Sequence, residues 1–350
     1  MKKYLYTITN RLSANGVVAL EILKDGNLQV VPGSPFLTGG QGSRSSQSQN
    51  GVWIDRDLLY AVDFGSNSFA VFRRHSEGTL DRLNSQPIPS QGNSPCSVCV
   101  SGGILYLVNQ GVRSSRGRAE PSVAVFAVEG GVVRPLPGSS FALRRGESPT
   151  QVIVNRQGTV LAIPSVRARG SLLHAYAIIP GAPGAGLLQE FDNSPLAITD
   201  TGFGFGSVWK ADGKTLFMTN AIGSGSVVRL KVDVRSRQIV EEARVTTPGN
   251  ACWAALSRGG DRLYVTNLLS LLVFDVSGGR LEQVQSVEVT DVTGPVLRDV
   301  IIGPGGKFLY ALEQRRRRIL VYSLDAGGRA ALVSELAIGI PGKTLGLALG

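Results

Sequence analysis

The stretch ILYLVN, residues 104–109, decides the fold because segments of its type occur seven times along the 350-residue chain. Each copy is a short apolar run with an aromatic residue or leucine in its third position. Apolar runs of this length between glycine-rich turns are typical of buried strands. The third-position residues recur at intervals of roughly 46 to 56 residues and are Tyr6, Tyr60, Tyr106, Leu161, Phe217, Tyr264 and Tyr310.

A second apolar run follows each of these segments after a loop. The seven runs occupy residues 17–23, 69–74, 123–128, 172–178, 227–232, 271–276 and 319–324. An apolar strand precedes each such pair of runs, and a weaker strand follows it after a second polar turn. The four strands together form a unit of the length of a propeller blade. The sequence therefore predicts an all-β fold. It is a single domain over residues 1–350, a seven-bladed β-propeller of four-stranded antiparallel blades.

The two ends of the chain predict how the ring closes. The first unit starts directly with its second strand, in residues 2–10, and nothing before it can serve as an innermost strand. The segment KTLGLALG, residues 343–350, is left over after the seventh unit and has the pattern of the missing strand. We expect this C-terminal strand to pair with the N-terminal blade, so that backbone hydrogen bonds close the ring and the last residues are essential for stability.

The charge of the chain indicates a class of partner. The formal net charge is +10, the pI is about 9.8, and arginine greatly outnumbers lysine. This charge favours anionic small molecules with carboxylate or phosphate groups, or acidic protein surfaces, and guanidinium groups suit bidentate binding of both anions. No apolar run approaches the roughly 18–20 residues that cross a bilayer, and the first residues lack a signal-peptide core. We expect a monomer without a membrane partner, cytoplasmic, or secreted if a signal peptide was removed.

Most loop arginines fall on one side of the predicted ring. In a four-stranded antiparallel blade, the loops between the second and third strands share one face with the connectors between blades; we call it the connector face. Its arginines are Arg11, Arg113, Arg116, Arg118, Arg144, Arg145, Arg167, Arg169 and Arg315–Arg318. The turns of the other face have mixed charge. The pattern predicts an anion-facing surface, with a merely solvated rim as the alternative, and the lack of interleaved aromatic residues disfavours nucleic acid.

The residues that most often form metal or redox sites do not form such a pattern here. Cys96 and Cys99 form a C-x-x-C, but an offset of three on a strand places the thiols on opposite faces. We expect small buried thiols, no disulfide framework, no metal site and no cofactor. His75 is expected in solvent, and His174, on a third strand, as a hydrogen-bonded packing residue. The GFGFG at residues 202–206 precedes no helix, so we expect it to begin a blade and not to bind phosphate.

With its blades laid out, the chain resembles the seven-bladed propeller lactonases, which include 6-phosphogluconolactonases and fungal carboxymuconate lactonizing enzymes. The phrases that carry the resemblance occupy residues 58–83, 249–267 and 303–314, and the Cys252-Trp253 pair sharpens it. The resemblance implies a pocket at the mouth of the central channel, on the connector face. It implies that basic groups there hold an anionic substrate and stabilise developing negative charge, while a histidine or glutamate moves protons.

The residues that this resemblance would make catalytic are largely replaced. Thr150 stands where a histidine enters blade four, Phe205 where an arginine enters blade five, and Ala221 where a glutamate follows that blade's second strand. Only Arg298 matches the family's arginine at the start of blade seven. No catalytic residue is therefore assigned. The expected ligand-binding residues are Arg298, Thr150, Gln151, Phe205, Arg113 and Arg167.

Three functions are compatible with these observations. The first is a catalytically degenerate lactonase-family propeller that binds an anionic ligand or an acidic partner on its arginine-rich face. The second is an active lactonase that hydrolyses or forms a sugar-acid or muconate-type lactone at a rearranged site around Arg298. The third is a protein-interaction scaffold. Glu147, Asp200 and Asp299 do not form a recognisable catalytic pair, and Arg298 beside Asp299 fits an internal salt bridge as well as a ligand clamp.

Overall fold

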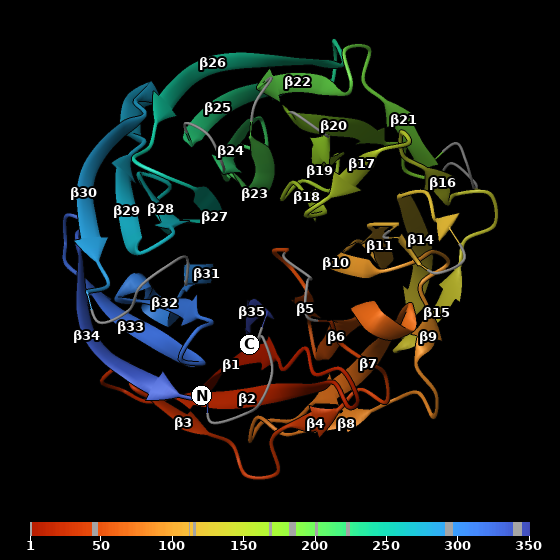
Figure 1. Cartoon of the computed structure of the whole chain (residues 1–350), viewed down its shortest axis with the longest axis horizontal. Coiled ribbons are helices and arrows are strands. Elements are labelled where there is room, and N and C mark those ends of the chain that lie inside the picture. The colour runs from red at the N-terminus through yellow and green to blue at the C-terminus, as the bar shows by residue number, and fades with distance from the viewer. Residues whose placement is uncertain are drawn as a thin grey trace.

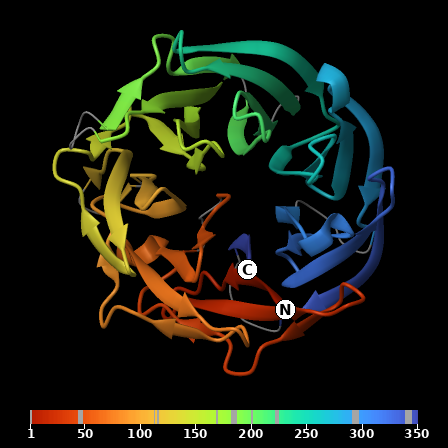
Figure 2. The same cartoon turned by 180° about the vertical axis from the view of Figure 1, so that it is seen from behind.

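Seven blade sheets surround a central axis in the computed structural model of the protein, as Figures 1 and 2 show. The structure describes residues 2–43, 48–111, 113–114, 117–167, 170–181, 187–199, 202–221, 225–290, 297–338 and 345–350; for 113–114, 117–118 and 199 it describes the backbone alone. The predicted all-β, seven-bladed propeller is confirmed. No helix in these ranges is long and apolar enough to cross a membrane.

Each blade is an antiparallel meander whose first strand lies innermost. From the inside outwards, blade one is β35 (Leu345–Leu349), β1 (Lys3–Ile8), β2 (Gly16–Ile22) and β3 (Leu28–Val30). Blade two is β5 (Val52–Asp55), β6 (Leu58–Asp63), β7 (Ser68–Arg74) and β8 (Leu80–Arg82). Blade three is β10 (Pro95–Ser101), β11 (Ile104–Asn109), β14 (Ser122–Glu129) and β15 (Val132–Pro135).

The second half of the ring follows the same order. Blade four is β17 (Glu147–Pro149) with β18 (Ile153–Val154), then β19 (Val160–Arg167), β20 (Gly170–Ile178) and β21 (Leu188–Glu190). Blade five is β23 (Phe203–Trp209), β24 (Thr215–Ala221), β25 (Ser226–Asp233) and β26 (Gln238–Thr246). Blade six is β27 (Ala251–Leu256), β28 (Arg262–Asn267), β29 (Ser270–Asp275) and β30 (Glu282–Glu288). Blade seven is β31 (Leu297–Ile302), β32 (Phe308–Glu313), β33 (Arg318–Leu324) and β34 (Ala330–Ala337).

Several shorter elements accompany the blades. Four short strands extend the edges of blades one to four: β4 (Phe36–Leu37), β9 (Ile88–Pro89), β16 (Phe141–Ala142) and β22 (Leu196–Thr199). A small hairpin, β12 (Arg113–Ser114) with β13 (Gly117–Arg118), lies in the loop between the second and third strands of blade three. In the described part of the chain the 3₁₀ turns are η1 (Phe64–Ser66), η3 (Ser277–Gly279) and η4 (Pro304–Gly306).

The ring closes through the C-terminal strand, as the sequence predicts. Strand β35 pairs antiparallel with β1. The backbone N–H of Tyr4 donates to the Gly350 carbonyl over 2.8 Å, and the N–H of Gly350 donates to the Tyr4 carbonyl over 2.9 Å. The last residues of the chain thus supply the innermost strand that blade one lacks.

The recurrent aromatic residue of the second strand has a structural role that explains its repetition. In three blades its ring is buried and its hydroxyl donates to a glycine carbonyl in the turn between the third and fourth strands of the next blade. These pairs are Tyr6 with Gly78 at 3.3 Å, Tyr264 with Gly328 at 2.8 Å and Tyr310 with Gly26 at 3.0 Å. A tyrosine combines a large apolar surface with a hydroxyl that needs a partner when buried, so this residue joins neighbouring blades.

The C-x-x-C of strand β10 differs from expectation in one respect. Both thiols are buried, as expected. They do not point to opposite faces, however, because both Cys96 and Cys99 belong to the hydrophobic cluster between blades three and four. The reason is an irregularity in the pairing of β10 with β11 between Pro95 and Ser97, which places Cys96 in a β-bulge. Its Sγ lies 3.4 Å from the Pro149 carbonyl.

We predict that Gly346→Ala destabilises the closed ring by about 1–3 kcal/mol. Gly346, in β35, has a φ of +72°, and an added Cβ would lie 2.9 Å from the backbone nitrogen of Val52 in the next blade. Urea denaturation measures the change. Gly327→Ala is the matched control, because a Cβ there meets only the Asp325 carboxylate at 3.4 Å. Equal midpoints for the two variants would contradict the proposed importance of the closing strand.

Candidate functional site

Arg298 lies where the resemblance places it, near the beginning of the innermost strand of blade seven. Its guanidinium carbon is 5.5 Å from the centre of the Trp253 ring, on the innermost strand of blade six. Its Nε donates to Oε1 of Gln314 over 3.1 Å. A cation over an indole face is electrostatically attracted, more strongly when it is partly desolvated. Two neighbouring blades therefore fix the orientation of this guanidinium group.

An apolar wall adjoins the guanidinium group. The ring of Phe205, half-buried on β23, lies 5.6 Å from the Trp253 ring. The thiol of Cys252 is buried beside them, and burial raises its pKa to about 12 against the opposing effect of Arg298. The thiol is thus neutral and belongs to the wall. We call Arg298, Trp253, Phe205 and Cys252 the Arg298 cluster.

The charge of Arg298 is not neutralised within the described part of the chain. No carboxylate there lies within ion-pair distance of its guanidinium group, and its Nη atoms have no hydrogen-bond partner among those residues. Burial lowers the pKa of Arg298, although an arginine stays protonated in proteins. A half-buried guanidinium fork with both Nη groups open is suited to a carboxylate or phosphate.

Asp299 does not form the salt bridge with Arg298 that the sequence leaves open. The pairing of β31 with β32 is irregular between Leu297 and Val300, and the Asp299 carboxylate is hydrogen-bonded elsewhere. It accepts from Gln49 Nε2 at 2.9 Å and from the backbone N–H groups of Leu347 at 2.7 Å and Val300 at 2.8 Å. Burial raises the pKa of Asp299 to about 7, against these hydrogen bonds, which lower it.

Segment 48–50 forms a polar belt across the channel, which no pattern in the sequence predicts. Gln49 Nε2 also donates to the Ala254 carbonyl of blade six at 3.0 Å, and Asn50 Nδ2 donates to the Val152 carbonyl of blade four at 3.1 Å. Ser48 Oγ donates to the Cys96 carbonyl of blade three at 2.5 Å. Residues that precede blade two thus reach blades on both sides of the channel.

A cavity of about 390 Å³ lies along the channel. It lies on the side of the belt away from the Arg298 cluster. Its lining includes Gln49 and Asn50 of the belt, Asp299, and residues of six innermost strands, for example Ile54, Leu256 and Ile302. These strands all run from the connector face to the opposite face. The belt therefore separates the Arg298 cluster from the cavity, and the cluster lies at the connector end of the channel.

Thr150 and Gln151 hold blades four and five together. Thr150 Oγ1 is buried and lies 3.1 Å from the Pro164 carbonyl, 2.8 Å from the Gly204 carbonyl and 3.0 Å from the Phe205 carbonyl. Gln151 donates to the Ser207 carbonyl over 3.1 Å and accepts from its backbone N–H at 2.6 Å. Both side chains are thus engaged in interblade hydrogen bonds. Two of the residues expected at the pocket, Phe205 and Arg298, lie against the same indole ring, that of Trp253.

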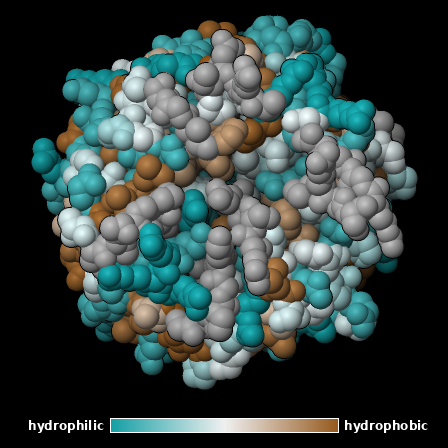
Figure 3. All heavy atoms as spheres, viewed as in Figure 1, coloured by the Kyte–Doolittle hydropathy of each residue, from teal (hydrophilic) through white to brown (hydrophobic). Residues whose placement is uncertain are grey.

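The arginine loops are only partly described. Arg167 is exposed at the end of β19. Arg144 and Arg145 are exposed in the connector from blade three to blade four, on the same face. Arg113 and Arg118 are described by their backbone alone. Arg116, Arg169 and the carboxylate Asp200 lie outside the described residues. On the face seen in Figure 3, hydrophilic residues lie around the rim with hydrophobic residues between them.

The turn with four consecutive arginines is organised by one buried glutamate. Glu313, the last residue of β32, accepts from the backbone N–H groups of Arg315 at 2.6 Å and Arg316 at 3.1 Å, and from Arg318 Nε at 3.0 Å. Arg318 is buried and also pairs with Glu335. Arg315, Arg316 and Arg317 are exposed. Arg318 therefore does not contribute to the predicted anion-facing surface, because it serves as an internal counter-ion.

The two histidines lie away from the Arg298 cluster. His174 is buried, as expected, and its Nε2 is 2.6 Å from Oε2 of Glu147, which is also buried. Hydrogen bonds and charge from Glu147 and Glu190 outweigh burial, so the pKa of His174 is raised. His75 pairs with Asp81 at 2.8 Å near the surface. Among the described residues, no group of three or more His, Cys, Asp or Glu side chains could hold a metal ion.

The geometry defines the chain as a seven-bladed propeller with an arginine–aromatic cluster at the connector end of its channel. Solved structures share this architecture over nearly the whole of both chains. A Lactobacillus plantarum protein has a TM-score of 0.78 and 18% identity, with 100% of each chain covered. The periplasmic gluconolactonase of Pseudomonas aeruginosa has a TM-score of 0.76 and 19% identity, with 99% of each chain covered.

A candidate 6-phosphogluconolactonase of Bacteroides fragilis has a TM-score of 0.75 and 19% identity, covering 99% of this chain and 98% of that one. No protein-family model and no curated protein matches the chain. At these identities the shared property is the fold, so the chain is a propeller of the architecture found in proteins described as lactonases.

We predict that Glu313→Gln lowers the free energy of unfolding by about 3 kcal/mol, because it leaves the buried Arg318 with less compensation. The neighbouring Arg317→Gln is the control. Arg317 is exposed in the same turn, so its replacement is expected to change stability by no more than about 0.5 kcal/mol. Urea denaturation of both variants measures the difference, and similar losses for the two would refute the role assigned to Glu313.

Asp299 also makes the stability depend on pH. Its pKa is about 7 in the folded protein and about 3.9 in an unfolded chain, so the folded state binds the proton more tightly. Its contribution to stability is therefore greatest below about pH 4 and is lost as the pH rises towards 7. The stability of the native protein minus that of Asp299→Asn should fall over this range, by about 1.4 kcal/mol per unit of pKa difference. Denaturation at several pH values tests this; parallel profiles would contradict it.

Proposed function

We propose that this lactonase-like propeller binds an anionic small molecule, carrying a carboxylate or phosphate group, at the Arg298 cluster on its connector face. The observation that carries the proposal is the half-buried guanidinium fork of Arg298, which stacks on Trp253 and has no carboxylate partner among the described residues. A bidentate anion would compensate the cost of its partial desolvation. The Phe205 and Trp253 rings would contact the apolar part of the same ligand.

The surrounding charge supports an anion at this place. Among the described connector-face loops, Arg144, Arg145 and Arg317 are exposed without a carboxylate at ion-pair distance. Glu147 and Glu313, on the same side, are buried in internal pairs and present little negative charge to a ligand. An arginine-rich face of this kind would raise the local concentration of anions and their association rate.

The proposal includes loss of the catalytic function that the resemblance implies. Proton transfer to or from a lactone needs a group within hydrogen-bond reach of it. Thr150, at the position of the family histidine, is buried and directed at three backbone carbonyls. Ala221, at the position of the family glutamate, has no ionisable group. Arg298 can hold and polarise an anion, but we infer that no general base accompanies it.

An active lactonase is the second candidate. The specific observation in its favour is the overlap of the whole chain with the periplasmic gluconolactonase of Pseudomonas aeruginosa. It requires a proton acceptor other than the family residues. The third possibility is an acidic protein partner on the arginine-rich face. Only the charge of the connector face supports it.

Calorimetric titration with 6-phosphogluconate tests the proposed site. We expect Arg298→Met to weaken binding at least tenfold, because the bidentate contact is lost, and Arg298→Lys to restore only part of it. Arg317→Met removes the same charge from an exposed turn of the same blade and is expected to change the affinity less than twofold. Equal affinities for the Arg298→Met variant and the native protein would overturn the proposal.

Turnover distinguishes the proposed binding protein from an active lactonase. The native protein is expected to bind 6-phosphogluconate without hydrolysing glucono-δ-lactone, 6-phosphogluconolactone or a carboxymuconolactone above the spontaneous rate. Hydrolysis that disappears with Arg298→Met would support the active lactonase and contradict the degenerate site. Binding of an acidic protein without small-molecule binding would favour the scaffold.

A further inference from the structure

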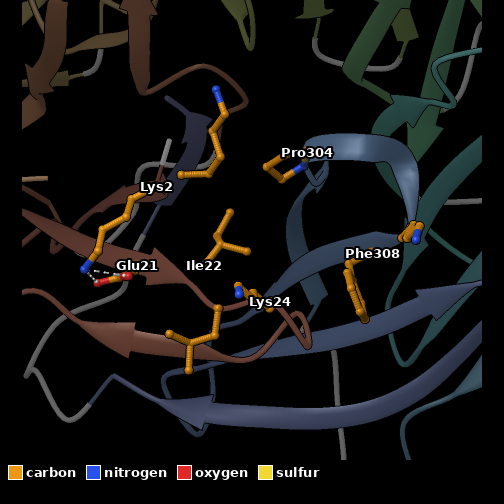
Figure 4. A pocket seen from close by; sticks show the side chains of 9 residues that line it. Lys2, Glu21, Ile22, Lys24, Pro304 and Phe308 are labelled. Atoms are coloured by element: carbon orange, nitrogen blue, oxygen red, sulfur yellow. Dashed lines mark hydrogen bonds and ion pairs between the residues drawn. The ribbon is translucent and has the colours of Figure 1, made fainter. Parts of the chain in front are cut away.

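A second basic pocket lies at the closing seam of the ring, far from the connector loops. It has a volume of about 510 Å³ and is formed by blades one and seven. Figure 4 shows Lys2, Glu21 and Lys24 on blade one, across from Pro304 and Phe308 on blade seven. Lys3, Ile22, Leu23 and Lys307 complete its lining. The turns that line the pocket connect the first strand of a blade to the second, or the third to the fourth. The pocket therefore opens on the face opposite the connector face.

The cationic residues of this pocket are unusual for this chain. The sequence has 28 arginines but only eight lysines, and four of these eight line the pocket: Lys2, Lys3, Lys24 and Lys307. The lining contains one carboxylate, that of Glu21, against these four ammonium groups, which leaves a formal charge of +3. Scattered surface charge in an arginine-dominated protein does not explain such a concentration of lysine.

The one carboxylate does not neutralise the pocket. Glu21 pairs with Lys2, with 2.9 Å between Oε1 and Nζ. Asp25, next to Lys24, turns into its own β-turn, where it accepts from the backbone N–H of Asn27 at 3.0 Å and from its Nδ2 at 2.8 Å. The charges of Lys3, Lys24 and Lys307 therefore remain for a ligand.

The backbone that carries these lysines is held in place. The turn of Lys24 is tied to blade seven, because Tyr310 donates to the Gly26 carbonyl at 3.0 Å and Ser334 donates to Asn27 Oδ1 at 2.6 Å. The turn before Lys307 is closed by the bond from the N–H of Gly303 to the Phe308 carbonyl at 2.8 Å. Only the flexible lysine side chains need to be ordered when a ligand binds, which lowers the entropic cost.

The apolar part of the lining completes a site for an organic phosphate. Phe308, Pro304 and Ile22 offer an apolar surface between the lysines. Lysines bind phosphate as mobile point charges, and a pocket of this volume lies in the range of small-molecule sites. We propose that this seam pocket binds a small phosphorylated molecule of nucleotide size, whose phosphates contact Lys3, Lys24 and Lys307 and whose ring system contacts Phe308 and Pro304.

Such a ligand would connect the two blades that close the ring. Lys24 belongs to blade one and Lys307 to blade seven, so a phosphate group that contacts both adds a bridge between them. Because the site exists only in the folded protein, binding raises the apparent stability by mass action. The proposal is independent of the Arg298 cluster, which lies on the other face.

Calorimetric titration with ADP tests the pocket. The double variant Lys24→Met/Lys307→Met is expected to weaken ADP binding at least tenfold and to abolish the ADP-induced rise of Tm. The double variant Lys214→Met/Lys231→Met removes the same charge from exposed positions of blade five and is the matched control, expected to change the affinity less than twofold. Arg298→Met is expected to bind ADP like the native protein.

The outcomes separate the parts of the proposal. Adenosine is expected not to bind, and pyrophosphate is expected to bind at least tenfold more weakly than ADP. Native-like ADP binding by the Lys24→Met/Lys307→Met variant overturns the site. An equal loss in the blade-five control overturns it too, because the effect is then one of net charge. Equal affinities for pyrophosphate and ADP contradict a ring-binding surface at Phe308 and Pro304.

Discussion

The pairing of β35 with β1 is the constraint on which the rest of the structure depends. Every other blade receives its innermost strand from the chain directly before it, whereas blade one receives it from the far end. This strand also completes the channel, because the backbone N–H of Leu347 donates to the Asp299 carboxylate of blade seven. Ring closure and the polar belt are thus coupled through one side chain, and the charge of Asp299 affects both.

The same innermost strand of blade seven carries two adjacent charges with opposite surroundings. Asp299 points into the belt, where three donors and deep burial make it structural. Arg298 points towards blade six, where it has an indole and an amide oxygen but no counter-ion in the described residues. Two neighbours in sequence thus belong to a closed internal network and to an open anion site, at a point where the pairing of β31 with β32 is irregular.

Much of the fold could be predicted from the sequence, because each blade repeats its aromatic second strand and the terminal segment completes the count. Arg298 could be placed by resemblance. The partners that decide its chemistry could not, since Trp253 reaches it through the register of two separate blades. Gln49 belongs to no repeat, and its contacts lie across the channel. Within the four-arginine run, only the three-dimensional structure distinguishes the buried Arg318 from its exposed neighbours.

The two basic regions also differ in the recognition that they allow. On the connector face the cations are arginines, and Arg298 is oriented by a stacked ring, which suits one planar, bidentate anion. At the seam the cations are lysines on tied turns, which suits phosphate groups of variable position. The belt of segment 48–50 lies across the channel that runs between the two faces. The two proposed sites lie on opposite faces, so two anionic ligands could bind at once, and only the seam ligand would contact both blade one and blade seven.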